Sequence, residues 1–380
     1  MADLAERLKD TQSSSGLAKD LAKAEKPRWR LAAIFAMVLG LGTLTVAVGN
    51  YMLAPLTYNG NAIREAAEAL AGGHNIAVRD LNMDWRTLRK EQIARLSARP
   101  DILIFGGSRW QAASGSLVPG KTMINAFVSS DHYEDMLAIT KILLDADKLP
   151  QTLMLSVRYS TFETFDQRPA ADWKVYGEDY RAMARQLGVP AHTWLETLPV
   201  QNGFNLLSLD ALVARWRDWR KTPRSWWTTP DLIDPTASIV GADGALHFSK
   251  AREEQANEQA SLQNALRHAA EDKLSRLKID PDGISAVTAL LQFLKNKGVR
   301  VILAQSPFHP AYFAGIKGSA YYDDLMAVED TIAKIAHDTG IEVYGSFDAT
   351  ALGCVAADFR DYHHARENCL GKITAQIWKQ

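Results

Sequence analysis

The sequence has little cysteine, almost no net charge and no evident internal repeat. Its 380 residues carry a net charge of −1, so electrostatics give no reason to expect a nucleic-acid partner. The two cysteines, Cys354 and Cys369, lie close together near the C-terminus. Hydrophobic residues make up 47% of the chain, which suffices for a large core. The length allows one large α/β domain with an insertion, or two domains.

Charged residues are absent from 31–63, which contains a candidate membrane-spanning helix. Its most apolar part, 31–54, is long enough to cross about 30 Å of hydrocarbon. Basic residues cluster at 26–30, and the next one is Arg64. By the positive-inside rule, this asymmetry predicts that residues 1–30 form a cytoplasmic tail.

A cleaved signal peptide is the alternative interpretation of this segment. The charged region of a signal peptide is normally short, and its apolar region spans about 7–15 residues. Both regions are longer here, which favours an uncleaved anchor. The sequence therefore predicts a single-pass protein of the bacterial inner membrane, with its C-terminal domain in the periplasm.

Beyond the anchor, predicted strands alternate with predicted helices. This order indicates a parallel, doubly wound α/β sheet. The predicted strands are 101–105, 122–127, 151–157, 299–305 and 341–347, and the predicted helices are 132–146, 284–297 and 321–339.

The predicted α/β domain consists of 99–160 and 283–380, with two further segments. Residues 55–98 are expected to form a helical linker, with helix over 62–98. Residues 161–282 are expected to be an insertion over the carboxyl edge of the sheet, where ligands bind in open α/β folds.

The insertion is rich in tryptophan. Several of the ten tryptophans lie between Trp173 and Trp227, and a long helical pattern covers 251–277. Exposed aromatic side chains often bind sugars or lipids, and packing in a core or interface is the alternative. The insertion is therefore the candidate surface for a glycan or a partner protein.

A serine follows the first predicted strand, in the run Gly106-Gly107-Ser108-Arg109. A serine at a strand-to-helix turn is exposed, and the helix N-terminus can support its hydroxyl as a nucleophile. The glycines allow a tight turn and leave space for a substrate. A simple helix N-cap is the alternative role for this serine.

A candidate acid–base pair lies near the C-terminus, in Asp361-Tyr362-His363-His364. Histidine can serve as the base for a hydroxyl nucleophile, and a carboxylate can fix its tautomer. An Asp three residues before a His can place both on one turn. An exposed loop or a metal-binding cluster is the alternative, although this set makes a weak metal site.

The two cysteines bracket this pair. In an oxidising compartment, a disulfide between Cys354 and Cys369 would close a loop of about 15 residues, worth about 3 kcal/mol in the chain-entropy model. It would also hold Asp361 and His364 in place. Two free thiols are the alternative.

These motifs together resemble those of the SGNH (GDSL-type) hydrolases. The first block of that family ends in Gly-Asp-Ser, where this chain has Gly106-Gly107-Ser108. Its last block is Asp-x-x-His, which matches Asp361 and His364. The resemblance covers 100–160 and 283–380. It implies a flavodoxin-like fold and a Ser-His-Asp mechanism, with no metal and no organic cofactor.

The chain departs from the family in the two blocks that bind the oxyanion. The second block normally offers a Gly backbone N–H, but 125–130 contains no glycine and the Ser129 N–H is the nearest substitute. The third block normally has Gly-x-Asn, where this chain has Ser156-Val157-Arg158. The Arg158 guanidinium could stabilise an oxyanion or bind a substrate carboxylate or phosphate. A surface or salt-bridged arginine is the alternative.

Such departures resemble the divergent, membrane-anchored branch of the family. It includes the DltD-like proteins of D-alanylation and the AlgJ/AlgX-like proteins of polysaccharide O-acetylation, which often work beside a membrane-bound O-acyltransferase. The resemblance implies an acyltransferase or esterase that acts on an envelope polysaccharide or related glycan. A catalytically inactive scaffolding subunit, partnered by a polysaccharide synthase or exporter, is the alternative. A lipid esterase has less support.

Overall fold

The structure is a computed structural model that describes most of the chain. The described residues are 29–50, 52, 60–79, 81, 83–164, 175–192, 207–210, 212–213, 216 and 226–378. The chain divides into two compact units. One consists of Met1–Ala54 and Val200–Pro223, and the other of Pro55–Pro199 and Arg224–Gln380.

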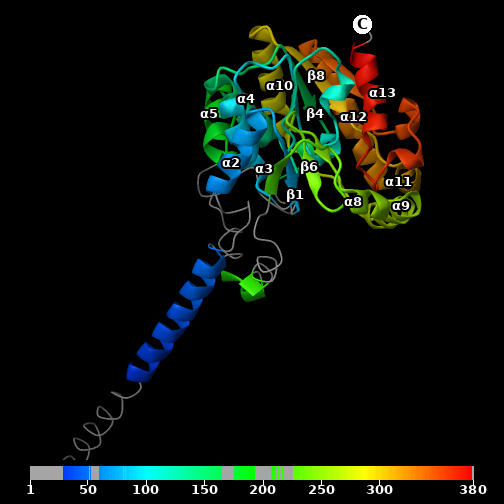
Figure 1. The fold of residues 1–380 in the computed structure, drawn as a ribbon. Helices are drawn as coiled ribbons and strands as arrows, with labels where there is room; N and C mark the ends of the chain where they lie inside the picture. The colour runs from blue at the N-terminus through cyan, green and yellow to red at the C-terminus, as the bar shows by residue number, and fades with distance from the viewer. Residues whose placement is uncertain are drawn as a thin grey trace, which may run out of the picture. The chain divides into compact units, whose positions relative to one another are not determined.

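The first unit contains one long apolar helix, Trp29–Asn50, shown in blue in Figure 1. Its 22 residues are long and apolar enough to cross a membrane. Large apolar side chains such as Leu31 and Phe35 are exposed. The hydroxyls of Thr43 and Thr45 each donate to the carbonyl four residues earlier at 2.8 Å, so neither is left unpaired in apolar surroundings.

The second unit is built on a parallel five-stranded sheet in the order β3-β2-β4-β8-β9. Figure 1 labels its strands β4 and β8. Every neighbouring pair is parallel, so the carboxyl ends of the strands meet at one edge. This confirms the predicted parallel α/β architecture and all five predicted strands. The strands are β2 (Ile102–Phe105), β3 (Met123–Asn125), β4 (Thr152–Ser156), β8 (Arg300–Gln305) and β9 (Glu342–Gly345).

Helices cover both faces of this sheet. Successive strand residues point to opposite sides, so apolar side chains of the strands need burial on both faces. In β2, Leu103 and Phe105 enter one core, whereas Ile102 and Ile104 enter the other. The predicted helices pack in the first core, and a C-terminal helix packs in the second. The helices of the first core include α4 (Tyr133–Asp145), α10 (Pro281–Asn296) and α12 (Ala320–Thr339), and that of the second is α13 (Glu367–Trp378).

The prediction of one helix over 62–98 is wrong. The segment forms helix α2 (Gly60–Ala71), strand β1 (Asn75–Val78) and helix α3 (Trp85–Arg95). The chain turns after α2 at Gly73, whose φ of +85° favours glycine. Side chains of α2 and α3 are buried in the first core, so this segment is part of the second unit.

Strand β1 belongs to an antiparallel sheet in the order β5-β1-β6-β7. Its partners β5 (Trp226–Thr229), β6 (Ser238–Val240) and β7 (Leu246–His247) come from the predicted insertion. The turn between β6 and β7 contacts the carboxyl edge of the parallel sheet. There, the Asn125 N–H donates to the Asp243 carbonyl at 2.6 Å.

The helical pattern over 251–277 is not one helix. It forms α8 (Lys250–Gln255) and α9 (Glu258–Asp272), because Asn257 caps α9 by accepting the Ala260 N–H. The insertion also contains α5 (Gly177–Leu187). In the tryptophan-rich stretch, Trp173, Trp194 and Trp219 lie outside the described residues. The role predicted for that stretch stays a prediction.

Candidate active site

Two loops bring the predicted serine, histidine and aspartate together. Ser108 begins a 3₁₀ turn, Ser108–Trp110, three residues after the last residue of β2, and Asp361 and His364 lie in the loop before α13. His364 Nε2 lies 2.8 Å from Ser108 Oγ, and His364 Nδ1 lies 2.6 Å from Asp361 Oδ2. The three side chains therefore form one continuous hydrogen-bonded chain, as a Ser-His-Asp mechanism requires.

Close packing, rather than an unusual backbone angle, explains why glycine occupies positions 106 and 107. A Cβ on Gly106 would lie 2.1 Å from Ser156 Cβ at the end of β4. A Cβ on Gly107 would lie 2.2 Å from Asp131 Oδ1. Gly107 has a φ of −81°, which any residue can adopt. Only glycine lets these neighbours approach the turn that carries Ser108.

Asp361 is placed to orient the histidine. Its Oδ1 accepts the backbone N–H groups of His363 and His364 at 2.9 and 2.8 Å, while Oδ2 faces the His364 ring. Burial opposes ionisation, but the charge and hydrogen bond of His364 outweigh it and hold the pKa of Asp361 well below its ordinary value. The ionised carboxylate favours the proton on Nδ1, which leaves Nε2 to accept the Ser108 proton.

The neighbouring His363 makes no hydrogen bond to Ser108 among the described residues. Burial, followed by the charge of His364, lowers the pKa of His363 well below its ordinary value, so this ring is neutral. Ligand atoms of Asp361, His363 and His364 lie within 4.8 Å of one another, close enough to hold a metal ion. Both ring nitrogens of His364 already face the serine and the aspartate, so the contacts fit proton transfer better than metal binding.

Helices α8 and α9 support the loop that carries Asp361 and His364 (the Asp–His loop). Arg360 Nε donates to Glu253 of α8 at 2.7 Å, and Arg366 pairs with the same carboxylate. The Tyr362 N–H donates to Asn264 Oδ1 of α9 at 3.1 Å. The sequence offers no signal for these contacts, because about 100 residues separate the partners.

Arg109, directly after the serine, is buried and joins two loops. Its Nη2 donates to the carbonyls of Ser306 and Pro307 at 2.6 and 2.8 Å, and its Nε donates to the His363 carbonyl at 3.2 Å. The guanidinium lies 4.1 Å from the centre of the Phe308 ring. Burial lowers the pKa of Arg109 to about 10, so the side chain stays charged at neutral pH.

His309 also lies in this region, but it is fully buried rather than lining an open pocket. Its backbone N–H donates to the Tyr362 carbonyl at 2.9 Å, and its Nδ1 accepts the Ala311 N–H at 3.1 Å. The first bond attaches the start of α11 (Pro310–Ile316) to the Asp–His loop, and the second caps α11.

The predicted disulfide is confirmed. Cys354 and Cys369 are bonded, with Cα atoms 5.6 Å apart, and both lie in the second core. The bond encloses the segment that carries Asp361 and His364.

Removing the disulfide is expected to lower the free energy of unfolding by about 3 kcal/mol, because the unfolded chain gains the entropy of an open loop of about 15 residues. The test is urea denaturation of a Cys354→Ala/Cys369→Ala variant, beside reduced wild-type protein as the control that keeps the side chains. Equal stability of oxidised and reduced wild type would contradict this expectation.

The two residues that were predicted to bind the oxyanion lie on two loops that follow strands of the parallel sheet. Ser129 lies between β3 and α4, and Arg158 follows β4 at the start of the 3₁₀ turn Tyr159–Phe162. In the described part of the chain, the backbone N–H groups of Ser108 and Ser129 have no hydrogen-bond partner. Arg158 pairs with the buried Asp131, which confirms the alternative of a salt-bridged arginine, although the sequence did not identify the partner.

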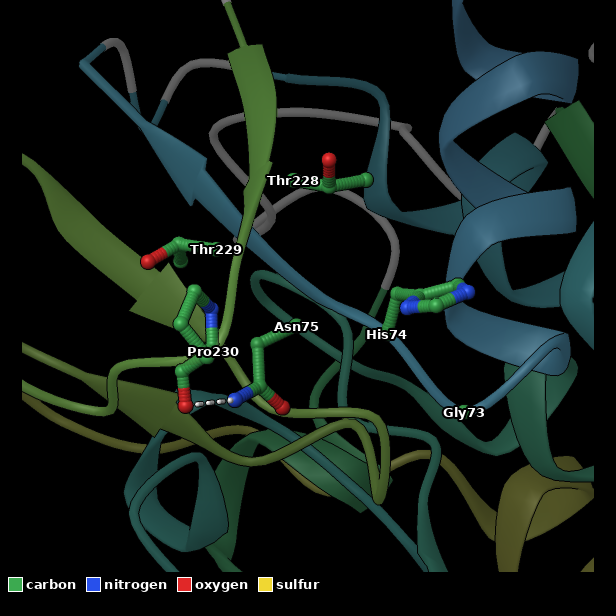
Figure 2. A pocket seen from close by; sticks show the side chains of 6 residues that line it. All are labelled: Gly73, His74, Asn75, Thr228, Thr229 and Pro230. Atoms are coloured by element: carbon green, nitrogen blue, oxygen red, sulfur yellow. Dashed lines mark hydrogen bonds between the residues drawn. The ribbon is translucent and has the colours of Figure 1, made fainter.

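A separate cavity of about 380 Å³ lies where the α2–β1 turn meets the end of β5 (Figure 2). Asn75 Nδ2 there donates to the Pro230 carbonyl at 3.3 Å. The cavity shares no residue with the hydrogen-bonded set of Ser108, His364 and Asp361. The residues that line it are Gly73, His74, Asn75, Thr228, Thr229 and Pro230.

No family model and no curated protein matches this chain.

Proposed function

We propose that the protein is a membrane-anchored, SGNH-like serine acyltransferase or esterase that acts on an envelope polysaccharide or related glycan. The observation that carries the proposal is the continuous contact from Ser108 through His364 to Asp361 at the carboxyl edge of a parallel sheet. Ligands of open α/β sheets bind at this edge. The proposal that the substrate is a glycan rests on the resemblance of the motifs to the membrane-anchored SGNH branch.

The reaction follows from the hydrogen bonds. His364 Nε2 takes the proton of Ser108 as Oγ adds to the acyl carbonyl carbon, while Asp361 stabilises the imidazolium. The tetrahedral intermediate collapses, and His364 returns the proton to the departing alcohol. His364 then removes the proton of a sugar hydroxyl, or of water in an esterase, as its oxygen adds to the acyl carbon. When the bond from the acyl carbon to Ser108 Oγ breaks, His364 returns that proton to Oγ.

The location proposed for this chemistry is the periplasm. An apolar N-terminal helix can serve as a single membrane anchor, with residues 1–30 on the cytoplasmic side. A buried disulfide is typical of proteins that fold in an oxidising compartment. A membrane-bound O-acyltransferase or a polysaccharide synthase is the proposed partner.

Labelling with a fluorophosphonate probe tests the activated serine. The full chain in detergent is expected to be labelled, the Ser108→Ala variant to be unlabelled, and His364→Ala to be labelled about 10²–10⁴ times more slowly, because it lacks the base. Ser285→Ala, which removes an exposed serine of α10, is the matched control and is expected to label normally. Intact labelling of Ser108→Ala would contradict the proposal. Absent labelling of folded wild-type protein would favour the scaffolding alternative.

A further inference from the structure

An ion pair lies against the turn that carries the serine. Arg158 Nε is 2.9 Å from Asp131 Oδ1, and Arg158 Nη2 donates to the Asp131 carbonyl at 3.2 Å. A Cβ on Gly107 would lie 3.3 Å from Arg158 Cζ. The guanidinium therefore lies close to the space that a side chain at position 107, directly before Ser108, would occupy.

This pair is buried. Asp131 is 0% exposed and Arg158 is 9% exposed. Within the described residues, neither carboxylate oxygen of Asp131 accepts a well-aligned hydrogen bond, so the nearby charge of Arg158 is its main compensation. Buried ion pairs add little net stability, because desolvation offsets their attraction. A role in the reaction explains this pair better than a contribution to stability does.

One nitrogen of the Arg158 guanidinium, Nη1, is not used in the pair with Asp131. Nε and Nη2 face Asp131, whereas Nη1 has no hydrogen-bond partner in the described part of the chain and is not completely buried. Carboxylates and phosphates are typically bound by two guanidinium nitrogens side by side. A single terminal nitrogen suits a single oxygen atom, such as the oxyanion of a tetrahedral intermediate.

We propose that Arg158 donates from Nη1 to the oxyanion of the reaction proposed above, and that Asp131 is the positioning residue that holds the guanidinium. This inference rests on the proposed function. When Ser108 Oγ adds to the acyl carbon, negative charge moves onto the carbonyl oxygen, and the N–H of Arg158 stabilises it without any bond forming or breaking at the arginine. The unpartnered N–H groups of Ser108 and Ser129 would complete the donor set.

The arrangement also specifies the class of substrate. Asp131 balances the charge of Arg158, so the site offers little attraction to an acyl group that is already anionic. A neutral carboxylic ester, which acquires negative charge only during the reaction, fits this pair best.

Hydrolysis of 4-nitrophenyl acetate by the full chain in detergent tests the assignment. Arg158→Gln is expected to lower kcat by about 10²–10³-fold with little change in KM, because the lost contact exists only in the transition state. Arg158→Lys should retain an intermediate rate. Asp131→Asn should lower kcat by a smaller factor. The double variant Arg158→Gln/Asp131→Asn should be no slower than Arg158→Gln, because Asp131 acts through Arg158.

The double variant removes both charges and so avoids an unpaired buried ion, which keeps the test valid if Asp131→Asn alone does not fold. Arg300→Gln, which breaks the Arg300–Glu342 pair at the opposite end of β8, is the matched control and should leave kcat unchanged. Ser108-dependent hydrolysis that Arg158→Gln leaves unchanged would overturn this inference alone. So would a loss confined to KM with mono-4-nitrophenyl succinate, which would make Arg158 a site for an anionic substrate. No Ser108-dependent hydrolysis by wild type would overturn the proposed function, and this inference with it.

Discussion

If the protein acts as proposed, Asp361→Asn is expected to lower kcat for ester hydrolysis by about 10⁴-fold, as the corresponding change does in a serine protease. The amide still occupies the same volume, but it can donate a proton to His364 Nδ1 and so favours the wrong tautomer. In that tautomer Nε2 carries the proton and cannot accept one from Ser108. Steady-state hydrolysis of 4-nitrophenyl acetate by the full chain measures the loss.

A matched control separates this effect from a general loss of charge. Asp338→Asn neutralises an exposed carboxylate of α12 and should leave kcat unchanged. If Asp361→Asn retained more than about a tenth of the wild-type kcat, the orienting role would be contradicted.

The same variant should change how stability depends on pH. The folded-state pKa of Asp361 lies below its unfolded value of about 4, so the group contributes stability above about pH 4 and loses it as the pH falls further. The difference in unfolding free energy between wild type and Asp361→Asn should therefore shrink as the pH falls below 4. Urea denaturation across this range measures it.

Arg109→Ala is expected to lower the free energy of unfolding by at least about 3 kcal/mol. It leaves two buried backbone carbonyls, of Ser306 and Pro307, and the part-buried His363 carbonyl without this donor, at about 1–3 kcal/mol for each buried group, although relief from burying an unpaired charge offsets part of this cost. It also detaches the Ser108 turn from the His363 carbonyl, so the rate of Ser108 labelling should fall as well. Urea denaturation measures the free energy of unfolding, and the fluorophosphonate probe measures the rate of Ser108 labelling.

Arg300→Ala is the control for this variant. Arg300 makes a bidentate pair with Glu342, with distances of 2.7 Å, but both side chains are 37% exposed. Such a pair contributes only about 0–1 kcal/mol, because water competes for both charges. A similar loss of stability in the two variants would contradict the role assigned to Arg109.

The strands and the motifs of the site were predictable because their signals are local. Apolar runs such as 101–105 and 299–305 predict strands of a parallel sheet whatever lies elsewhere in the chain. Ser108 follows one of these strands directly, and Asp361 and His364 share one turn. The disulfide was predictable because the chain has only two cysteines, one on each side of that turn.

Strand β1 was missed for a physical reason. Gly72-Gly73 ends the amphipathic helix before it, but the four residues of β1 are too short a run to show the period of two that predicts a strand. They become a strand by pairing with β5 and β6, which lie about 150 residues further along the chain. Pairing with distant strands commonly overrides local helical preference.

The sequence alone predicted the apolar helix, the five strands of a parallel sheet and the three residues of the Ser-His-Asp set. The order of the strands in the sheet and the contacts that support these three residues are visible only in the folded structure. Asp131 meets Arg158, and Arg109 meets the His363 carbonyl, across gaps of 27 and 254 residues. Such contacts depend on how separate loops converge at the carboxyl edge of the sheet, because local propensity and spacing carry no information about which distant groups a buried charge will meet.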